Sequence, residues 1–453
     1  MKLILLSGGS GTRLWPISND ARSKQFLKVL ANTQGDRVSM LQRVWSQLDA
    51  VDLSHSAIIA TSKSQVDMIH NQIENDVPVI VEPERRDTFP AIALAAVYLY
   101  SVGGVGLDEV ITVLPVDSYV EDAFFQKVKE LEQVVRSSGA EFALMGVEPT
   151  FPSEKYGYIA VNSEHPAEPC FTVREFHEKP KTAKAKALIE EGAFWNCGVF
   201  AFKLDTIISI LSYKGFPVVY EKLLSNYSDL PKISFDYEVL EKSGNIVVIR
   251  YDGHWKDLGT WNTLTEEMVE PLTGKGVISP DCVNTHVMNE LDIPIAVLGL
   301  SNVIVAASPD GILVTDKNES ARLKELIRFD QRPMYEERRW GWYRVLDYTK
   351  IDDGSEVLTR RIKIDAGKNL SYQLHYKRSE VWTVISGEGE AVVDGNLLKV
   401  KPGDVVKIPQ ETKHGIKAIT DLEFIEVQTG IEVMDEDVVR MHATWDEVMG
   451  VIV

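Results

Sequence analysis

The chain has 453 residues, of which 44% are hydrophobic and 25% are charged, and its formal net charge is −19. This length predicts two or three domains with large buried cores, and the negative charge argues against binding to nucleic acids or anionic membranes. The three cysteines are too few and too widely spaced for a disulfide framework, and the apolar runs are too short to cross a membrane. We therefore expect a cytoplasmic protein.

The first 26 residues form the most distinctive string of the chain, MKLILLSGGSGTRLWPISNDARSKQF. The apolar run Leu3–Leu6 predicts a buried strand. It continues into a turn made of Ser7, Gly8, Gly9, Ser10 and Gly11. Glycines let a ligand approach the backbone, and the N–H groups of such a turn can bind phosphate oxygens. With the cations Arg13 and Lys24 nearby, the segment predicts a site for a polyanion.

Two common phosphate-binding motifs do not account for this segment. A P-loop ends in Lys followed by Ser or Thr, which is not found here. A Rossmann fingerprint needs a third glycine where Leu14 stands, which also disfavours a nicotinamide-dependent oxidoreductase. The string instead resembles the signature of sugar-1-phosphate nucleotidyltransferases, and Arg13–Pro16 followed by Lys24–Phe26 is similar to the mannose-1-phosphate guanylyltransferase branch. This resemblance implies that Ser7, Gly8, Gly9, Gly11 and Thr12 bind the nucleotide.

Short β-branched runs alternate with helical patterns in residues 1–262. Strands are predicted at Ala57–Thr61, Val77–Val81 and Val110–Leu114, and helices at Met40–Leu48 and Ala91–Tyr100. The alternation predicts a mostly parallel sheet with helices on both faces and ligands beyond the carboxyl ends of its strands. A proline in Val77–Val81 predicts an edge strand. The family resemblance implies a Rossmann-like (GT-A-like) α/β domain with a mixed sheet.

The rest of the chain is predicted to be mainly β. Short strands punctuated by Pro, Gly and Asn are predicted at Val277–Ile278, Val287–Met288, Ala296–Leu298, Val303–Ala306 and Ile312–Val314. They indicate a small connector, which is β-helix-like in the family. A helix is predicted at Leu323–Ile327, and the charged run Glu336–Arg339 predicts a solvated linker. Evenly spaced turns from Trp342 to about Gly430 predict a barrel or jelly roll. We expect domains at 1–262, 263–330 and 331–453.

Two aspartates are the predicted metal ligands of the first domain. Nucleotidyl transfer brings two polyanions together, and Mg²⁺ held by carboxylates is the usual means of neutralising their charge. Asp117 follows an apolar run and should lie at the end of a strand, while Asp257 lies in the string Trp255–Trp261, which resembles the family's W-x-D-[VL]-G-[ST]-W. The resemblance implies that Asp117 and Asp257 bind Mg²⁺ and that, with Arg13 and Lys24, they are catalytic.

Further strings resemble the sugar-phosphate and nucleotide sites of the family. The Y-G-Y, E-K-P and W-N-[SA]-G patterns imply that the sugar phosphate is bound by Gly157, Tyr158, Glu178, Lys179 and Asn196. Another string, similar to E-P-x-x-R-N-T, implies that Glu82, Arg86 and Thr88 lie at the nucleotide. Asp87 stands where the family has asparagine, which leaves the recognition of the base open.

The resemblance implies in-line attack of mannose 1-phosphate on the α-phosphorus of GTP, with GDP-mannose and pyrophosphate as products and no covalent nucleophile. We expect GTP and mannose 1-phosphate as substrates and a homo-oligomer. Asp87, Phe89, Val116 and Ser118 depart from the guanylyl pattern, so a different sugar 1-phosphate or a different NTP is the alternative. A non-catalytic protein that binds a nucleotide sugar or a metal is a further alternative.

The C-terminal β region contains a second candidate metal site, Gln373, His375, Glu380 and His414. Their order and spacing resemble the cupin motif, especially the type II phosphomannose isomerase domain fused to guanylyltransferases. Two His with Gln and Glu suit Zn²⁺, Mn²⁺ or Fe²⁺. Three of the four histidines in the family's Q-M-H-H-H-R-x-E-H-W are replaced, and its D-x-Y-G-R is not found. We therefore expect a metal-binding cupin-like domain of structural role, with isomerase activity as the alternative.

Overall fold

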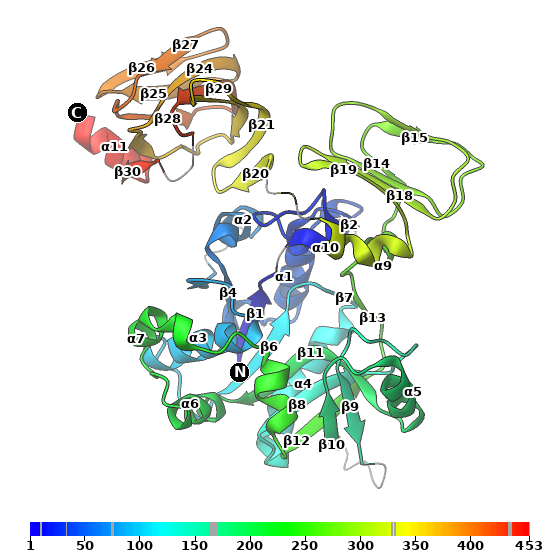
Figure 1. Ribbon diagram of the computed structural model, residues 1–453. Helices are drawn as coiled ribbons and strands as arrows, with labels where there is room; N and C mark the ends of the chain where they lie inside the picture. Colours follow the sequence, from blue (N-terminus) through cyan, green and yellow to red (C-terminus); the bar gives the residue numbers. More distant parts are fainter. Residues whose placement is uncertain are drawn as a thin grey trace. The chain divides into compact units, whose positions relative to one another are not determined.

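The computed structural model describes residues 1–9, 11–32, 34–73, 77–162, 170–327, 329, 332–433 and 437–452 (Figure 1). The chain divides into two compact units. The first comprises Met1–Leu14 and Ser23–Pro271, and the second comprises Trp15–Arg22 and Leu272–Val453. The segment Trp15–Arg22 therefore leaves the first unit and belongs to the second. Among the described residues, no helix is long and apolar enough to span a membrane.

The first unit is built on a sheet that has nine strands in the described part of the chain, in the order β5-β4-β1-β6-β11-β8-β12-β10-β9. The strands are β1 (Lys2–Ser7), β4 (Ala57–Ser62), β5 (Val79–Glu82), β6 (Val110–Pro115), β8 (Phe142–Val147), β9 (Tyr158–Val161), β10 (Phe171–His177), β11 (Phe194–Lys203) and β12 (Ile246–Tyr251). The proline-containing run forms β5, at the sheet edge as predicted. The mostly parallel sheet expected from the alternation is wrong, because β11 pairs antiparallel with both β6 and β8. The mixed sheet implied by the family resemblance is confirmed.

Helices cover both faces of this sheet (Figure 1). The core on one face is contributed by α1 (Met40–Ala50), α2 (Val66–Gln72), α4 (Ala123–Ser138) and α5 (Thr182–Glu190). The core on the other face is contributed by α3 (Thr88–Ser101), α6 (Leu204–Tyr213), α7 (Tyr220–Ser225) and α8 (Phe235–Glu238). Strand alternation divides β1 between them, since Leu3 and Leu5 enter the first core and Ile4 the second.

Short elements complete the first unit. They are β2 (Leu30–Ala31), β3 (Arg37–Val38), β7 (Ser118–Val120), β13 (Trp255–Asp257), α9 (Trp261–Thr265) and the 3₁₀ turns η1 (Gly11–Leu14), η2 (Lys24–Phe26), η3 (Ser54–Ser56), η4 (Lys63–Gln65), η5 (Tyr227–Asp229) and η6 (Leu240–Lys242). The antiparallel pair β7–β13 positions the two predicted metal ligands, because its register places Asp257 opposite Ser118, the residue after Asp117.

The second unit contains the predicted β connector. Its strands are β14 (Leu272–Thr273), β15 (Gly276–Ile278), β16 (His286–Asn289), β17 (Ile295–Val297), β18 (Val303–Ser308) and β19 (Gly311–Asp316), followed by η7 (Glu319–Arg322) and α10 (Leu323–Leu326). Parallel pairing of β14, β16 and β18, and of β15 with β17, gives the β-helix-like arrangement expected from the family.

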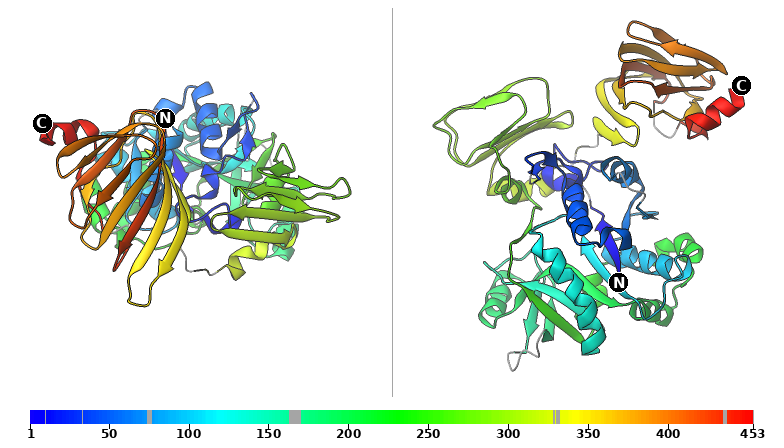
Figure 2. Two further views of the ribbon diagram at one scale, coloured as in Figure 1. Left: turned by 90° about the horizontal axis from the view of Figure 1, so that it is seen from above. Right: turned by 180° about the vertical axis from the view of Figure 1, so that it is seen from behind.

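The C-terminal part of the second unit is a two-sheet β domain (Figure 2). One sheet comprises β20 (Tyr335–Arg338), β21 (Gly341–Lys350), β22 (Glu356–Ile364), β29 (Leu422–Gly430), β24 (Arg378–Ser386) and β27 (Val405–Ile408). The other comprises β26 (Asn396–Val400), β25 (Gly389–Val393), β28 (His414–Ala418), β23 (Tyr372–Leu374) and β30 (Val439–His442), and α11 (Trp445–Ile452) ends the chain. The predicted solvated linker Glu336–Arg339 is wrong, because β20 pairs with β21 and the Glu336 side chain is buried.

Candidate active site

A buried hydrogen-bond network supports the glycine turn. Gln65 Nε2 donates to Ser23 Oγ (2.6 Å), which in turn donates to the Gly9 carbonyl (3.0 Å). Gln25 Nε2 donates to Ser7 Oγ (3.3 Å). Ser7 was predicted to lie at the nucleotide, and its side chain is fully buried and takes part in this network. The network joins β1 and the glycine turn to Ser23 and Gln25, the residues on either side of Lys24.

The turn itself presents open backbone. Gly8 and Gly9 are exposed, and a Cβ built on either meets no atom within 4 Å. Gly9 has φ +145°, a conformation that favours glycine. Gly11 begins η1, whereas Ser10 and the side chain of Thr12 lie outside the described residues. The backbone at Gly8 and Gly9 is therefore open, and phosphate binding there stays a prediction.

Lys24 joins the two predicted metal ligands. Its Nζ lies 2.9 Å from Asp117 Oδ2 and 2.9 Å from Asp257 Oδ1. Asp117 lies between β6 and β7, and Asp257 ends β13, so the β7–β13 pairing brings together carboxylates that are far apart in the sequence. Both predicted catalytic aspartates and Lys24 therefore form a single cluster.

The cluster is strongly coupled electrostatically. Burial favours the neutral amine of Lys24, but the Asp117 and Asp257 carboxylates outweigh it and raise the pKa of Lys24. Burial likewise opposes ionisation of Asp257, yet the charges of Lys24, Arg13 and Lys155 hold its pKa below the ordinary value. At neutral pH the lysine is therefore a cation and Asp257 an anion.

Arg13 lies beside the same carboxylate. A Cβ on Gly259 would stand 2.9 Å from Asp257 Oδ2 and 3.3 Å from Arg13 Nη1. The Arg13 side chain is exposed, so its guanidinium is accessible to an anion. All four predicted catalytic residues, Arg13, Lys24, Asp117 and Asp257, thus lie in one region of the first unit.

Most of the predicted sugar residues are brought together, from the start of β9, the end of β10 and the beginning of β11. The backbone N–H of Asn196 donates to the Gly157 carbonyl (2.8 Å), and the backbone N–H of Lys179 donates to the Tyr156 carbonyl (3.2 Å). A Cβ on Gly157 would lie 2.5 Å from Glu178 Oε2. Lys179 forms an ion pair with Glu178. Gly157 is therefore needed so that the Glu178 carboxylate can lie against the backbone.

Asp236 is a further member of this group that had no assigned role. Asn196 Nδ2 donates to Asp236 Oδ1 (2.9 Å). Burial, followed by the charge of Glu178, raises the pKa of Asp236 to about 7, and burial also raises the pKa of Glu178. The contact could not be read from the sequence, because Asn196 and Asp236 are 40 positions apart in the chain.

Tyr158 was predicted to bind the sugar phosphate, but its side chain does not face the other sugar residues. Its side chain is fully buried, and its hydroxyl donates to the Ser153 carbonyl (3.1 Å) and accepts from the Ser153 amide (2.8 Å). In the same string, Tyr156 packs edge-on against Trp195 and Trp255. The Y-G-Y pattern thus places only its glycine among the sugar residues.

The Glu82–Thr88 string makes contacts within the protein. Tyr227 donates its hydroxyl proton to the buried Glu82 carboxylate (2.7 Å). Arg86 Nε donates to the Leu230 carbonyl (2.9 Å). Thr88 Oγ1 accepts from the Phe235 amide (2.8 Å). These side chains hold the segment that leads into Asp236, so the string has a structural role, and its contact with the nucleotide stays a prediction.

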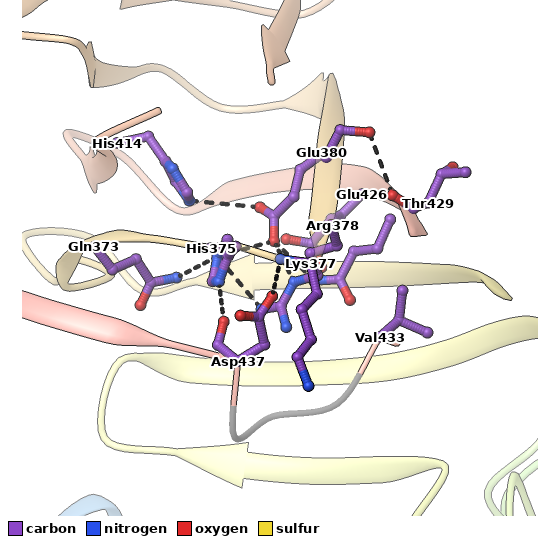
Figure 3. A network of polar contacts seen from close by, with 12 residues as sticks. Gln373, His375, Lys377, Arg378, Glu380, His414, Glu426, Thr429, Val433 and Asp437 are labelled. Carbon is purple, nitrogen blue, oxygen red and sulfur yellow. Dashed lines mark hydrogen bonds and ion pairs between the residues drawn. The ribbon is translucent and has the colours of Figure 1, made fainter. Parts of the chain in front are cut away.

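The second candidate site lies inside the C-terminal β domain (Figure 3). His375, Glu380 and His414 are buried and place a ligand atom each within 4.8 Å of one another. Nδ1 of His414 contacts the Thr412 carbonyl (2.9 Å), and Nδ1 of His375 contacts the Asp437 carbonyl. Since carbonyls only accept, each Nδ1 carries a proton, and each Nε2 faces the Glu380 carboxylate, at 3.2 Å from His375 and 3.6 Å from His414. Gln373 Nε2 lies 3.4 Å from His375 Nε2, so all four predicted ligands are adjacent.

Further buried side chains surround this cluster. On β24, Arg378 Nε donates to Glu380 Oε1 (3.1 Å) and Trp382 Nε1 donates to Glu380 Oε2 (3.2 Å). On β29, Gln428 Nε2 donates to Glu380 Oε1 (2.9 Å), and burial raises the pKa of Glu426 to about 7. Sequence reasoning missed these residues, although the alternation that places Glu380 inward also places Arg378 and Trp382 inward.

Comparison with known proteins adds independent information. Residues 2–273 match the nucleotidyl transferase family, and residues 331–443 match the family described as mannose-6-phosphate isomerase C-terminal. The chain is 32% identical over 476 residues to xanthan biosynthesis protein XanB of Xanthomonas campestris pv. campestris strain B100, with 98% of both chains covered. It is 29% identical over 480 residues to mannose-1-phosphate guanylyltransferase of Escherichia coli K12, covering 96% of this chain and 97% of the relative.

A solved structure supports the same relationship. The crystal structure named mannose-1-phosphate geranyltransferase, from Thermus thermophilus, aligns with a TM-score of 0.60 and 27% identity over 72% of this chain and 97% of that chain. The family match contains the glycine turn and the Lys24 cluster described above. The chain therefore belongs to the nucleotidyl transferase family.

Proposed function

We propose that the protein condenses GTP with α-D-mannose 1-phosphate to give GDP-mannose and pyrophosphate. The observation that carries the proposal is the contact of Lys24 Nζ with both Asp117 and Asp257, next to an open glycine turn and Arg13. Relatives matched over nearly their full length support the choice of substrates, since the Escherichia coli relative is named mannose-1-phosphate guanylyltransferase.

The residues of the cluster suit Mg²⁺. Asp117 and Asp257 already direct one oxygen each at a single cation, the Lys24 ammonium, and carboxylate oxygens are the ligands that Mg²⁺ prefers. We propose that these two carboxylates hold the ion. When bound, Mg²⁺ would neutralise charge on the phosphates.

The side chains then orient and neutralise the reactants. The backbone N–H groups of the glycine turn bind the triphosphate, and Arg13 and Lys24 stabilise charge on the α-phosphate and on the leaving pyrophosphate. A phosphate oxygen of the sugar phosphate forms a bond to the α-phosphorus, while the bond from that phosphorus to the bridging oxygen of pyrophosphate breaks. Positioning and charge compensation supply the rate enhancement.

The sugar phosphate is held by a separate group of residues. The Glu178 carboxylate accepts hydrogen bonds from hexose hydroxyls, and the Asn196 side chain accepts and donates them. Lys179, which pairs with Glu178, binds the phosphate. Gly157 lets the sugar and Glu178 approach the backbone. We add Asp236, which Asn196 contacts directly, to this group.

A substrate panel tests the proposal. Pyrophosphate release is measured for each of GTP, ATP, UTP and CTP with mannose 1-phosphate, glucose 1-phosphate and a heptose 1-phosphate. We expect the highest kcat/KM for GTP with mannose 1-phosphate. Turnover confined to another nucleotide or another sugar phosphate would refute the assignment, and no turnover with any pair would favour a binding protein.

We also propose that the C-terminal domain binds a transition metal ion such as Zn²⁺, Mn²⁺ or Fe²⁺. His414 Nε2 is buried and has no hydrogen-bond partner in the described part of the chain, and it faces the Glu380 carboxylate at 3.6 Å. An unpaired imidazole lone pair beside a buried carboxylate suits such an ion. Elemental analysis should find about one bound ion per chain, lost in the His375→Ala variant. Conversion of mannose 6-phosphate to fructose 6-phosphate tests isomerase activity separately.

A further inference from the structure

The loop between two of the proposed catalytic residues belongs to a different compact unit from the residues themselves. Arg13 lies in the first unit, Trp15–Arg22 lies in the second, and the chain returns to the first unit at Ser23, directly before Lys24. The segment that follows Arg13 and precedes Lys24 is therefore part of the second unit.

The first half of this loop packs on the ends of β18 and β19. Ser308 Oγ donates to the Pro16 carbonyl (2.5 Å). A Cβ on Gly311 would stand 2.4 Å from Trp15 Cζ2, so the indole lies directly on the glycine backbone. Only a residue without a side chain allows this close approach.

Asn19 and Asp310 join the middle of the loop to the connector. Asn19 Nδ2 donates to Asp310 Oδ2 (2.9 Å), and the other Asp310 oxygen accepts from the Met334 amide (2.7 Å). Asn19 Oδ1 accepts from the amides of Ala21 and Arg22 (3.0 and 2.8 Å). One asparagine thus shapes the loop and attaches it to a buried carboxylate.

Arg22 joins the end of the loop to two further elements. Its Nη1 lies 2.8 Å from Glu290 Oε2 in the connector, and its guanidinium carbon lies 5.2 Å from the centre of the Tyr335 ring in β20. The Arg22 side chain is only 11% exposed. Removing one partner of a buried ion pair costs more than removing an exposed one, because it leaves a buried charge unpaired.

We infer that the connector positions the catalytic cations through this loop, and that Asn19, Arg22, Glu290 and Asp310 are positioning residues for the transfer reaction. Only Leu14 lies between Arg13 and Trp15, and only Ser23 lies between Arg22 and Lys24. The chain between each cation and the attached loop can therefore span at most about 7 Å. A shift of the loop is therefore transmitted to both cations. The inference rests on the proposed roles of Arg13 and Lys24.

The Asn19–Asp310 contact permits a reciprocal exchange. Asp310→Asn alone sets two amide donors against each other, and Asn19→Asp alone sets two carboxylates against each other. The double variant restores one donor and one acceptor, and it keeps the acceptors for the Met334, Ala21 and Arg22 amides. We expect each single variant to lower kcat/KM for GTP by between about tenfold and 100-fold, because small displacements of catalytic groups cost this much. The KM for mannose 1-phosphate should be unchanged, and the double variant should recover the wild-type kcat/KM.

The control is Asp292→Asn, which neutralises an exposed carboxylate of the same connector that contacts Lys275 and Arg344. It should leave kcat/KM for GTP unchanged. Wild-type kcat/KM in both single variants, or single-variant losses that the double variant does not recover, would overturn the inference. Arg13→Ala and Lys24→Ala are assayed in parallel. If they keep full turnover, the proposed function has failed; if they are inactive while the loop variants are normal, only the positioning role has failed.

Discussion

Gly157 is the residue at which a single added methyl group tests the sugar site. In Gly157→Ala the new Cβ would stand 2.5 Å from Glu178 Oε2 and 3.1 Å from Phe176 Cζ, so the carboxylate has to move. We expect KM for mannose 1-phosphate to rise by about tenfold or more, with KM for GTP unchanged, as measured by initial rates of pyrophosphate release.

Gly106→Ala is a suitable control for this change, because a Cβ there meets no atom within 4 Å and the backbone is not in the left-handed region. That variant should have wild-type kinetic constants. An unchanged KM for the sugar phosphate in Gly157→Ala would show that Glu178 does not contact the sugar.

Asp236 predicts a pH dependence of stability. Burial and the Glu178 charge raise its pKa to about 7, well above the ordinary value of an aspartate. The folded protein therefore keeps a proton on Asp236 that the unfolded chain loses, so this stabilising contribution is present below the unfolded pKa and is lost as pH rises through about 7. Asp236→Asn should raise Tm relative to wild type more at about pH 8 than at about pH 5. Calorimetry showing the same Tm difference at both pH values would contradict the assignment.

The site residues show what a sequence string can and cannot reveal. Lys24, Asp117 and Asp257 were predicted from strings that are specific in both residue type and order, and they are in contact. Tyr158 was predicted from a string as well, but its ring is buried, because a motif does not show to which face of a strand a side chain points. Asp236 was not assigned, because its partner Asn196 is distant in sequence.

At the level of elements, β24 holds the candidate metal cluster through alternation. Arg378, Glu380 and Trp382 all point inward, and Trp382 Nε1 donates to Glu380 Oε2 (3.2 Å) and to Glu426 Oε1 (3.2 Å). Trp382→Phe keeps an aromatic ring and removes the one N–H donor that makes both hydrogen bonds. We expect the affinity for Zn²⁺ to fall by about tenfold to 100-fold, the usual cost of losing a residue that orients a metal ligand.

Competition with a chromophoric chelator measures this affinity directly. Trp340→Phe is the matched control, since Trp340 packs against the same core from a partly buried position. Equal affinities for the Trp382→Phe and wild-type proteins would show that Trp382 does not orient Glu380.

The elements were largely predictable where the pattern is local. The predicted helix Met40–Leu48 appears as α1, whose start is fixed by a capping box of Ser39 and Gln42. Strand direction was not predictable, because the antiparallel insertion of β11 between β6 and β8 depends on pairing between distant segments. The charged strand β20 was missed because its polar composition hides a buried face, on which Glu336 pairs with Arg338.

For the whole molecule, the separate cores predict separate responses to ligands. The sheet of the first unit has its own two cores, and the C-terminal β domain has another. A ligand stabilises the part of the protein that binds it. Calorimetry should therefore show one transition that rises with Mg²⁺ and GTP and another that falls when bound transition metal is removed with a chelator. A single transition that responds equally to both treatments would contradict this prediction.

Turnover of Asp257→Asn tests most directly whether Lys24, Asp117 and Asp257 form the catalytic centre. The substitution preserves shape but removes the charge that Lys24 Nζ contacts at 2.9 Å. In the presence of Mg²⁺, GTP and mannose 1-phosphate, we predict that kcat for pyrophosphate release falls by about 100-fold or more while Tm stays near the wild-type value. A well-folded Asp257→Asn variant with the wild-type kcat would contradict the assignment of this cluster as the active site.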